Sequence, residues 1–225
     1  GERLFIDISS VKGKSYSGSK FWLLVVDDNS DMAWSWFLKQ KSDLKDKLLP
    51  FVKQLKNKDK KTVKYIRCDN AGENKKFEEA CANDGLGVQF EYTSPGTPQQ
   101  NGRVERKFAT LYGRVRAMLN GAKLTSVLRK GLWTECASTA TKNECLMLEH
   151  GQEKPRHTRF YGKDAPYGRM LKNFGEMGVV FDHGKKTIRP KLDNRGRHCV
   201  FVGYPENHSE NVYRMFNTLT KKVNF

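Results

Sequence analysis

The sequence contains no long apolar run. No stretch approaches the roughly 18 consecutive apolar residues that a membrane-spanning helix requires, and hydrophobic residues make up 37% of its 225 residues. Its mean hydropathy of −0.72 is typical of a soluble protein. The chain begins at Gly1 and Glu2, with neither an initiator Met nor a cleavable leader. We therefore expect no membrane partner and no secretion, and we interpret the chain as a segment of a longer polypeptide.

Paired cysteines are also missing. The five cysteines are odd in number and none lies in a CxxC pair, so the sequence predicts neither a disulfide framework nor a zinc knuckle. The five histidines fall at no zinc-binding spacing with the cysteines. Unpaired cysteines are typical of a reducing compartment.

Negative charge is scarce. The chain has 25 acidic residues against 41 basic ones, which gives a net charge of +16 and a pI ≈ 9.7. A field of that sign concentrates polyanions around a protein, so nucleic acid is the expected partner. The alternative is a generically basic surface, because the lysines and arginines are scattered from end to end. No amphipathic helix segregates the charge, which disfavours a membrane-surface protein.

The hydrophobic pattern predicts an α/β layer. Alternating or continuous apolar runs indicate five strands, at residues 3–9, 21–26, 32–38, 63–68 and 88–92. Apolar residues at spacings of three and four indicate helices beginning at Ser42 and following the glycine- and proline-rich loop 93–102, with shorter helices at 77–83 and 132–149. This order predicts a mixed five-stranded sheet flanked by helices.

Strand and turn signals return towards the end of the chain. Apolar runs at 175–181, 199–204 and 212–216 are separated by clusters of Gly, Asp and Asn, a pattern typical of a small β-barrel. We therefore predict a core domain at 1–150, a connector at 151–174 and a small β domain at 175–225.

Three acidic residues lie where chemistry could occur. Asp7 interrupts an apolar strand, Asp69 follows the fourth predicted strand, and Glu105 lies beside the buried stripe of the long helix, with 35 residues between the last two. Carboxylates are the oxygen ligands that Mg²⁺ prefers, and two ions about 3.5–4 Å apart can support displacement at phosphorus. The alternative is that Asp69-Asn70 and Asn101-Gly102 are ordinary turns. Each turn taken alone favours that alternative, whereas the three acids together favour a cation site.

The segments around these acids resemble a known family. They are RCDNAGE at 67–73 and SPGTPQQNGRVERK at 94–107, together with segments at 4–7, 21–28, 160–163, 171–175, 191–193 and 201–204. In these segments the chain resembles the integrase of Ty1/copia-type retrotransposons over nearly its whole length. The resemblance implies a ribonuclease H-like, retroviral-integrase-like catalytic core followed by an SH3-like small domain.

The resemblance also implies an activity. Asp7, Asp69 and Glu105 match the metal-binding catalytic triad of that family, which uses two Mg²⁺ or Mn²⁺ ions. The implied reaction is DNA strand transfer, in which the 3′ hydroxyl of the element's cDNA end attacks a phosphodiester of target DNA. The implied partners are double-stranded DNA and further copies of the chain, and the implied place of action is the nucleus, after a cytoplasmic particle stage.

Residues near Glu105 are candidates for DNA contact. The basic residues of the long helix could neutralise backbone phosphates, and the loop before it could order over the DNA end, as in similar integrases. A solvated basic face is the alternative for each cation. The sequence departs from the family at Phe108 and Ala109, where relatives often carry Asn and Arg. The candidates are Gln99, Gln100, Asn101, Arg103, Arg106, Lys107, Arg114 and Arg116.

Two other functions share these features. An element-derived, catalytically inactive DNA-binding structural module would keep the basic surface and the fold. A nuclease of the same fold would use water in place of the 3′ hydroxyl and would cut DNA without joining it.

Overall fold

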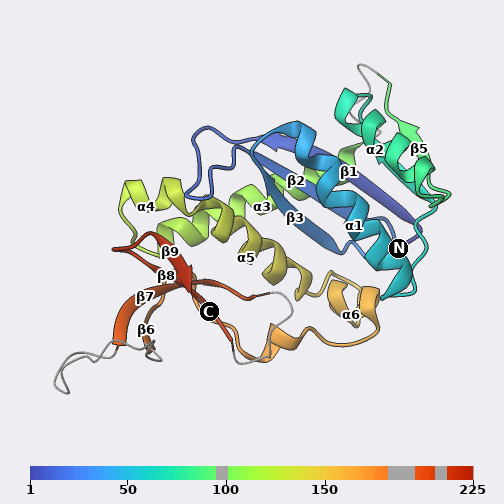
Figure 1. Ribbon diagram of the computed structural model, residues 1–225. Coiled ribbons are helices and arrows are strands. Elements are labelled where there is room, and N and C mark those ends of the chain that lie inside the picture. The colour runs from blue at the N-terminus through green and yellow to red at the C-terminus, as the bar shows by residue number, and fades with distance from the viewer. Residues whose placement is uncertain (95–100, 182–195, 206–211, 225) are drawn as a thin grey trace, which may run out of the picture.

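The computed structural model describes residues 1–94, 101–181, 196–205 and 212–224. The larger sheet has the strand order β3-β2-β1-β4-β5 (Figure 1). The first three strands pair antiparallel, whereas β1, β4 and β5 run parallel, so the predicted mixed five-stranded sheet is confirmed. Its strands are β1 (Arg3–Ser10), β2 (Phe21–Asp27), β3 (Ala33–Leu38), β4 (Tyr65–Cys68) and β5 (Gln89–Tyr92).

Helices cover both faces of this sheet because its strands are apolar on both sides. The ring of Trp22 meets Phe108 of α3 edge-on at 5.4 Å between centroids. On the opposite face, Trp34 and Trp36 pack on Phe51 of α1, at 5.1 and 4.9 Å. The helices are α1 (Leu44–Asn57), α2 (Gly72–Asn83), which lies beside α1, α3 (Gly102–Gly121) and α5 (Trp133–Cys145), which lies beside α3.

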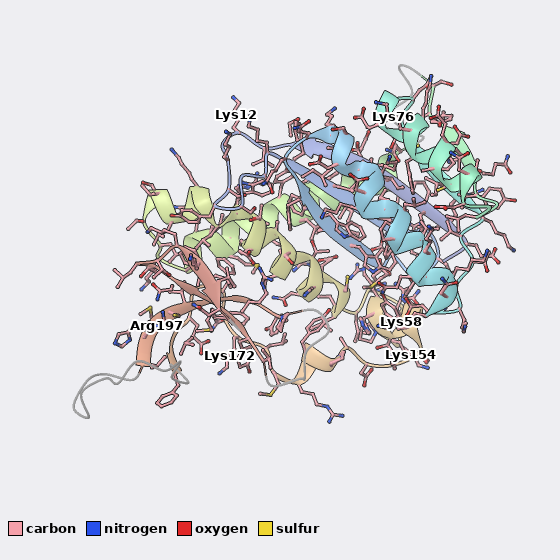
Figure 2. All side chains as sticks on the ribbon, in the orientation of Figure 1. Lys12, Lys58, Lys76, Lys154, Lys172 and Arg197 are labelled. Atoms are coloured by element: carbon pink, nitrogen blue, oxygen red, sulfur yellow. The ribbon has the colours of Figure 1, made fainter. Side chains whose placement is uncertain are left out.

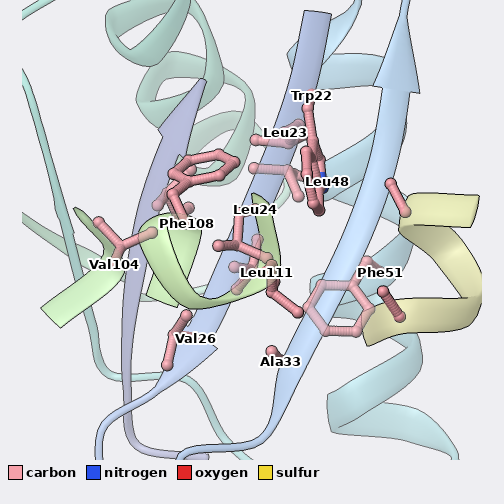
Figure 3. Packing of buried hydrophobic residues seen from close by; sticks show 14 of the residues in the cluster. Trp22, Leu23, Leu24, Val26, Ala33, Leu48, Phe51, Val104, Phe108 and Leu111 are labelled. Carbon is pink, nitrogen blue, oxygen red and sulfur yellow. The ribbon is translucent and has the colours of Figure 1, made fainter. Parts of the chain in front are cut away.

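The apolar stripe of α3 fixes which way this helix faces. Val104, Phe108 and Leu111 lie against Leu24 and the neighbouring residues of β2 (Figure 3). Phe108 is 5% exposed and belongs to the core, whereas Ala109 is exposed. Phe108, where the sequence departs from the family it resembles, therefore lies on the buried side of the helix.

A second sheet lies beside α5, at the far end of the molecule from α2 and β5 (Figure 1). Its strands pair antiparallel in the order β6-β7-β8-β9. Thr139 Oγ1 of α5 donates to the carbonyl of Val202 at 2.7 Å, and Arg214 forms a bidentate pair with Glu135. The predicted small β domain therefore docks on the core helix that precedes it. The strands are β6 (Met177–Phe181), β7 (Gly196–Gly203), β8 (Arg214–Asn217) and β9 (Lys222–Asn224).

The predicted connector contains helical turns of its own. Phe160 of α6 packs edge-on against Trp34 at 4.8 Å, and Trp34 Nε1 donates to Tyr161 Oη at 3.1 Å. Sequence periodicity could not reveal these elements because each is six residues or shorter. The boundaries at residues 150 and 174 stay a prediction. The connector elements are α6 (Arg156–Tyr161) and a 3₁₀ turn (Pro166–Arg169), and another short helix, α4 (Ser126–Gly131), follows α3 within the predicted core.

Two smaller details concern the helices. A 3₁₀ turn, Lys41–Asp43, precedes α1, so the helix begins at Leu44 rather than at the predicted Ser42. No helix in the described part of the chain has both the length and the apolar character needed to cross a membrane.

Candidate active site

Asp7 faces α3. It pairs with Leu24 in the β1–β2 register, so it lies on the α3 face of the sheet together with Phe5 and Ser9. Both of these neighbours contact α3: the guanidinium of Arg103 lies 5.9 Å from the centre of the Phe5 ring, and Tyr112 Oη donates to Ser9 Oγ at 2.9 Å. The helix therefore crosses β1 over Asp7, and Glu105 lies between its two contacts.

Asp69 follows the end of β4, the strand that pairs with β1. The parallel β1–β4 ladder ends at Phe5 and Arg67, two residues before Asp7 and Asp69, and the charge of Asp69 acts on Asp7. Asn74 Nδ2 donates to Asp69 Oδ1 at 2.6 Å and to the Asp69 carbonyl at 3.1 Å. Asn74 is 5% exposed.

The contact of Asn74 with Asp69 was not predicted from the sequence. An Asn five residues after an Asp, in the first turn of a helix, is a signal that could have found it. Glu73, its neighbour, points to a different partner, because its carboxylate pairs with Lys41 at 3.6 Å.

Glu105 is placed by the start of α3. Asn101 Nδ2 donates to the carbonyl of Ile6 at 3.4 Å, and the backbone N–H of Glu105 donates to the carbonyl of Asn101 at 3.3 Å. Asn101 is 7% exposed, whereas Glu105 is exposed. The side chain of Asn101 is turned inward and joins α3 to the strand residue next to Asp7, and its contact with DNA stays a prediction.

The three carboxylates lie within electrostatic range of one another. Burial raises the pKa of Asp7 above its usual value, and the charges of Asp69 and Glu105 raise it further. The Ile8 N–H, which donates to Asp7 Oδ1 at 2.8 Å, and the charge of Lys41 oppose this rise. The site therefore concentrates negative charge that a cation would neutralise.

The donor chemistry of this cluster fits Mg²⁺ or Mn²⁺. Both ions take carboxylate oxygens, and two ions commonly share such a set with water and phosphate oxygens. Asp69 is already oriented by Asn74, and the Oδ1 atoms of Asn74 and Asn101 are buried without a hydrogen-bond partner among the described residues. Within those residues, no three His, Cys, Asp or Glu side chains are gathered closely enough to form a ready metal site.

The predicted DNA-binding cations of α3 differ in their exposure to solvent. Arg106 and Arg116 are exposed on α3. Lys107 is 7% exposed, and its ammonium group pairs with Asp31 and with Glu144. Its ammonium group is therefore engaged inside the protein, and its contact with DNA stays a prediction.

Two further cations on α3 are partly engaged. Arg103 Nη1 donates to Asp28 Oδ1 at 2.7 Å, and Arg114 pairs with Glu144. Both side chains are 35% exposed, so part of each faces solvent. Gln99 and Gln100 lie outside the described residues.

Basic side chains occur on widely separated parts of the molecule. The labelled basic side chains, including Lys12, Lys58, Lys76 and Lys154, lie around the whole outline of the molecule (Figure 2). Such a distribution attracts DNA without directing it to one point.

A cavity of about 460 Å³ lies elsewhere, between β3, α1, α5 and the small domain. Its walls include Trp34, Trp36, Tyr167 and Tyr204, and none of the three site acids lines it. Its lining carries no carboxylate among the described residues. It therefore lacks the groups that two-metal chemistry needs.

Known proteins resemble this chain in sequence and in fold. Residues 179–225 match the family of the retroviral polymerase SH3-like domain. Over 93% of its length, the chain is 33% identical to the retrovirus-related Pol polyprotein from transposon TNT 1-94 of Nicotiana tabacum. The chain is therefore similar in sequence to one part of a retrotransposon Pol polyprotein. It is also 26% identical, over 90% of its length, to the Pol polyprotein from transposon RE1 of Arabidopsis thaliana.

The chain spans 15% and 13% of the length of these two polyproteins. A chain of the simian T-cell lymphotropic virus intasome, solved in complex with PP2A regulatory subunit B56 gamma, has a similar fold. The TM-score is 0.54 at 18% identity, and the match covers 88% of this chain and 68% of that one. The predicted resemblance and the predicted fold class, an integrase-type core with an SH3-like domain, are confirmed.

Proposed function

We propose that this chain is the catalytic core of a retrotransposon integrase, and that it joins a cDNA end to target DNA in a metal-dependent strand transfer. The observation that supports the proposal is the crossing of α3 over β1, together with the charges of Asp69 and Glu105, which both act on Asp7. The similarity to Pol polyproteins over 93% of the chain supports the same reaction class.

In the proposed reaction, Asp7, Asp69 and Glu105 would hold two Mg²⁺ or Mn²⁺ ions. When bound, such ions activate the attacking oxygen and stabilise the leaving oxygen during in-line displacement at phosphorus. The attacking group is the 3′ hydroxyl of the cDNA end, which forms the new phosphodiester as the target strand breaks.

The protein's own part is to orient the carboxylates and hold the DNA. Asp7 must be ionised to act as a ligand, and its raised pKa means that it gives up its proton less readily than an exposed Asp. Asn74 orients Asp69, and Asn101 fixes the start of the helix that carries Glu105. Arg106 and Arg116 contact backbone phosphates in this proposal.

The proposed partners are double-stranded DNA, at the element ends and at the target, and further copies of the chain. The fold shared with a chain of an intasome supports both partners. Action in the nucleus follows from a chromosomal target.

Strand transfer in vitro tests the proposal. We expect Asp69→Asn and Glu105→Gln each to abolish Mg²⁺-dependent joining of an oligonucleotide end. Glu79→Gln is the matched control, since it removes an exposed acidic charge of α2 that has no role in the proposed site and should keep wild-type joining. Full joining by either site variant would refute the proposal. Cutting without joining would identify a nuclease, and salt-dependent DNA binding without either reaction would identify an inactive binding module.

A further inference from the structure

Asp31 is a buried carboxylate shared by several ion pairs, and the proposed reaction does not use it. It is 8% exposed and adopts a φ of 56°, in the left-handed region that residues other than Gly rarely occupy. Three cations converge on its carboxylate: Lys107 Nζ, Arg156 Nε at 2.8 Å and Arg103 Nε at 3.7 Å. A strained backbone that holds a buried acid against three cations calls for an explanation.

Two of these cations lie on either side of Glu105 in the sequence. Arg103 precedes it by two residues and Lys107 follows it by two, all within α3. Residues four apart on a helix share one face, and the residue midway between them faces another side. Asp31 therefore pairs with one face of α3, while Glu105 points away from that face. These ion pairs restrict the rotation of the helix about its axis.

The network extends beyond α3, and four of its members are buried: Asp31, Lys107, Glu144 and Arg156. Burial alone would raise the pKa of Asp31, but hydrogen bonds and charges from Lys107 and Arg156 outweigh it, so the pKa lies below its usual value. Lys107 also pairs with Glu144 at 3.4 Å, and Arg156 donates to the Glu144 carbonyl at 3.1 Å. Ionic groups cost free energy to bury and often add no net stability, so a network of this size is better explained by fixing one arrangement of the helices.

We propose that Asp31 is a positioning residue, which acts through Lys107 to set the rotation of α3 and so to place Glu105 opposite Asp7 and Asp69. The inference rests on the proposed function, because it concerns where that site's third carboxylate lies. Asp31 does not touch the reacting groups. It acts on the opposite side of the helix from them.

Binding of Mn²⁺ alone tests this role without relying on catalysis. The loss of the free Mn²⁺ signal in electron paramagnetic resonance gives the affinity of each variant directly. Lys107→Met keeps a good helix former of similar length and removes the link between Asp31 and α3. We expect it to weaken Mn²⁺ binding about tenfold, as changes behind a ligand commonly do.

Arg156→Met is the matched control. It removes another cation from the same carboxylate, but Arg156 lies on α6 and leaves the contacts between Asp31 and α3 in place. It should lower stability and leave the affinity for Mn²⁺ within about twofold of the wild-type value, whereas a merely structural role would affect both variants alike. Asp31→Asn is the second variant, since Asn tolerates the left-handed φ and should weaken binding as Lys107→Met does.

A double-mutant cycle separates the two proposals. If Asp31 acts through Glu105, Lys107→Met should have no further effect on Mn²⁺ binding in a Glu105→Gln background. Equal losses in both backgrounds, or no loss for Lys107→Met in folded protein, would overturn the positioning role and leave the proposed function intact. Absence of Mn²⁺ binding by the wild-type chain would overturn both.

Discussion

Asn74 fixes Asp69 at two points, donating to its carboxylate Oδ1 at 2.6 Å and to its main-chain carbonyl at 3.1 Å. One buried amide thus sets both the side chain and the backbone of a residue that lies just beyond the end of β4. Since Asp69 has left the sheet ladder, this amide and the Ala71 N–H are what orient its carboxylate.

The first prediction concerns this amide. Asn74→Ala should lower the apparent affinity for Mg²⁺ by about 10–100-fold, because a freed carboxylate samples other rotamers. It should also lower the free energy of unfolding by about 1–2 kcal/mol, through the lost buried hydrogen bonds. Joining rates over a range of Mg²⁺ concentrations, together with urea denaturation, measure both effects. Asn70→Ala removes an exposed amide from the same turn and should change neither.

Removing the charge of Asp7 should stabilise the metal-free protein. Burial and two neighbouring carboxylates disfavour the ionised form, and Asp7→Asn relieves both effects. We expect the free energy of unfolding without metal to rise by about 0.5–2 kcal/mol, a range typical of relieved functional sites. Thermal denaturation in EDTA measures it. A loss of stability on this substitution would mean that Asp7 is held by favourable contacts instead of being repelled.

His157 should contribute to the pH dependence of stability. Burial lowers its pKa in the folded state, and its bond to the Lys163 carbonyl opposes this only in part. At pH values above the unfolded-state pKa of about 6.5, His157 is neutral in both the folded and the unfolded state, and its full contribution to stability is present. As pH falls below that value, the unfolded state binds the proton first, so stability is lost down to the folded-state pKa.

His157→Gln should therefore flatten the dependence of unfolding free energy on pH between about 7 and 5, the range in which histidine titrates. The variant should also be less stable at pH 7, since it loses the ring contact with Tyr161, which has 4.7 Å between centroids. His150→Gln, at an exposed position, should leave the slope unchanged. An unaltered slope for His157→Gln would show that another group causes the dependence.

The close packing of the second sheet on α5 depends on Gly203. This residue has a φ of 146°, and a Cβ added there would lie 2.6 Å from Thr139 Oγ1 of α5. We expect Gly203→Ala to lower the free energy of unfolding by about 1–3 kcal/mol, from crowding and backbone strain. Gly113→Ala is the control, since nothing lies within 4 Å of that added Cβ. In a helix interior it should stabilise by about 0.5–1 kcal/mol, and a Gly203→Ala variant as stable as wild type would contradict the docking.

The main-domain strands, the three larger helices and the face of α3 could be predicted from the sequence because they depend on local periodicity. The stripe of Val104, Phe108 and Leu111 predicts which side of α3 is buried, and the position of Glu105 beside it follows. The position of Asp69 just after β4 follows from the apolar run that precedes it.

The internal partners of the basic residues could not be predicted in the same way. Lys107 meets Asp31 from 76 residues away along the chain, and no local pattern distinguishes it from the exposed Arg106. A cation next to a catalytic glutamate suggests DNA, and only the fold shows which cations turn inward. The contact of Asn101 could not be predicted for a related reason, since an Asn-Gly loop does not reveal that its amide reaches Ile6.

A crystal structure of this chain with Mn²⁺, with the ions located by anomalous scattering, tests the central claim most directly. The account predicts two peaks about 3.5–4 Å apart, bounded by the carboxylates of Asp7, Asp69 and Glu105. Anomalous peaks elsewhere, or three carboxylates that remain apart at a saturating Mn²⁺ concentration, would contradict it.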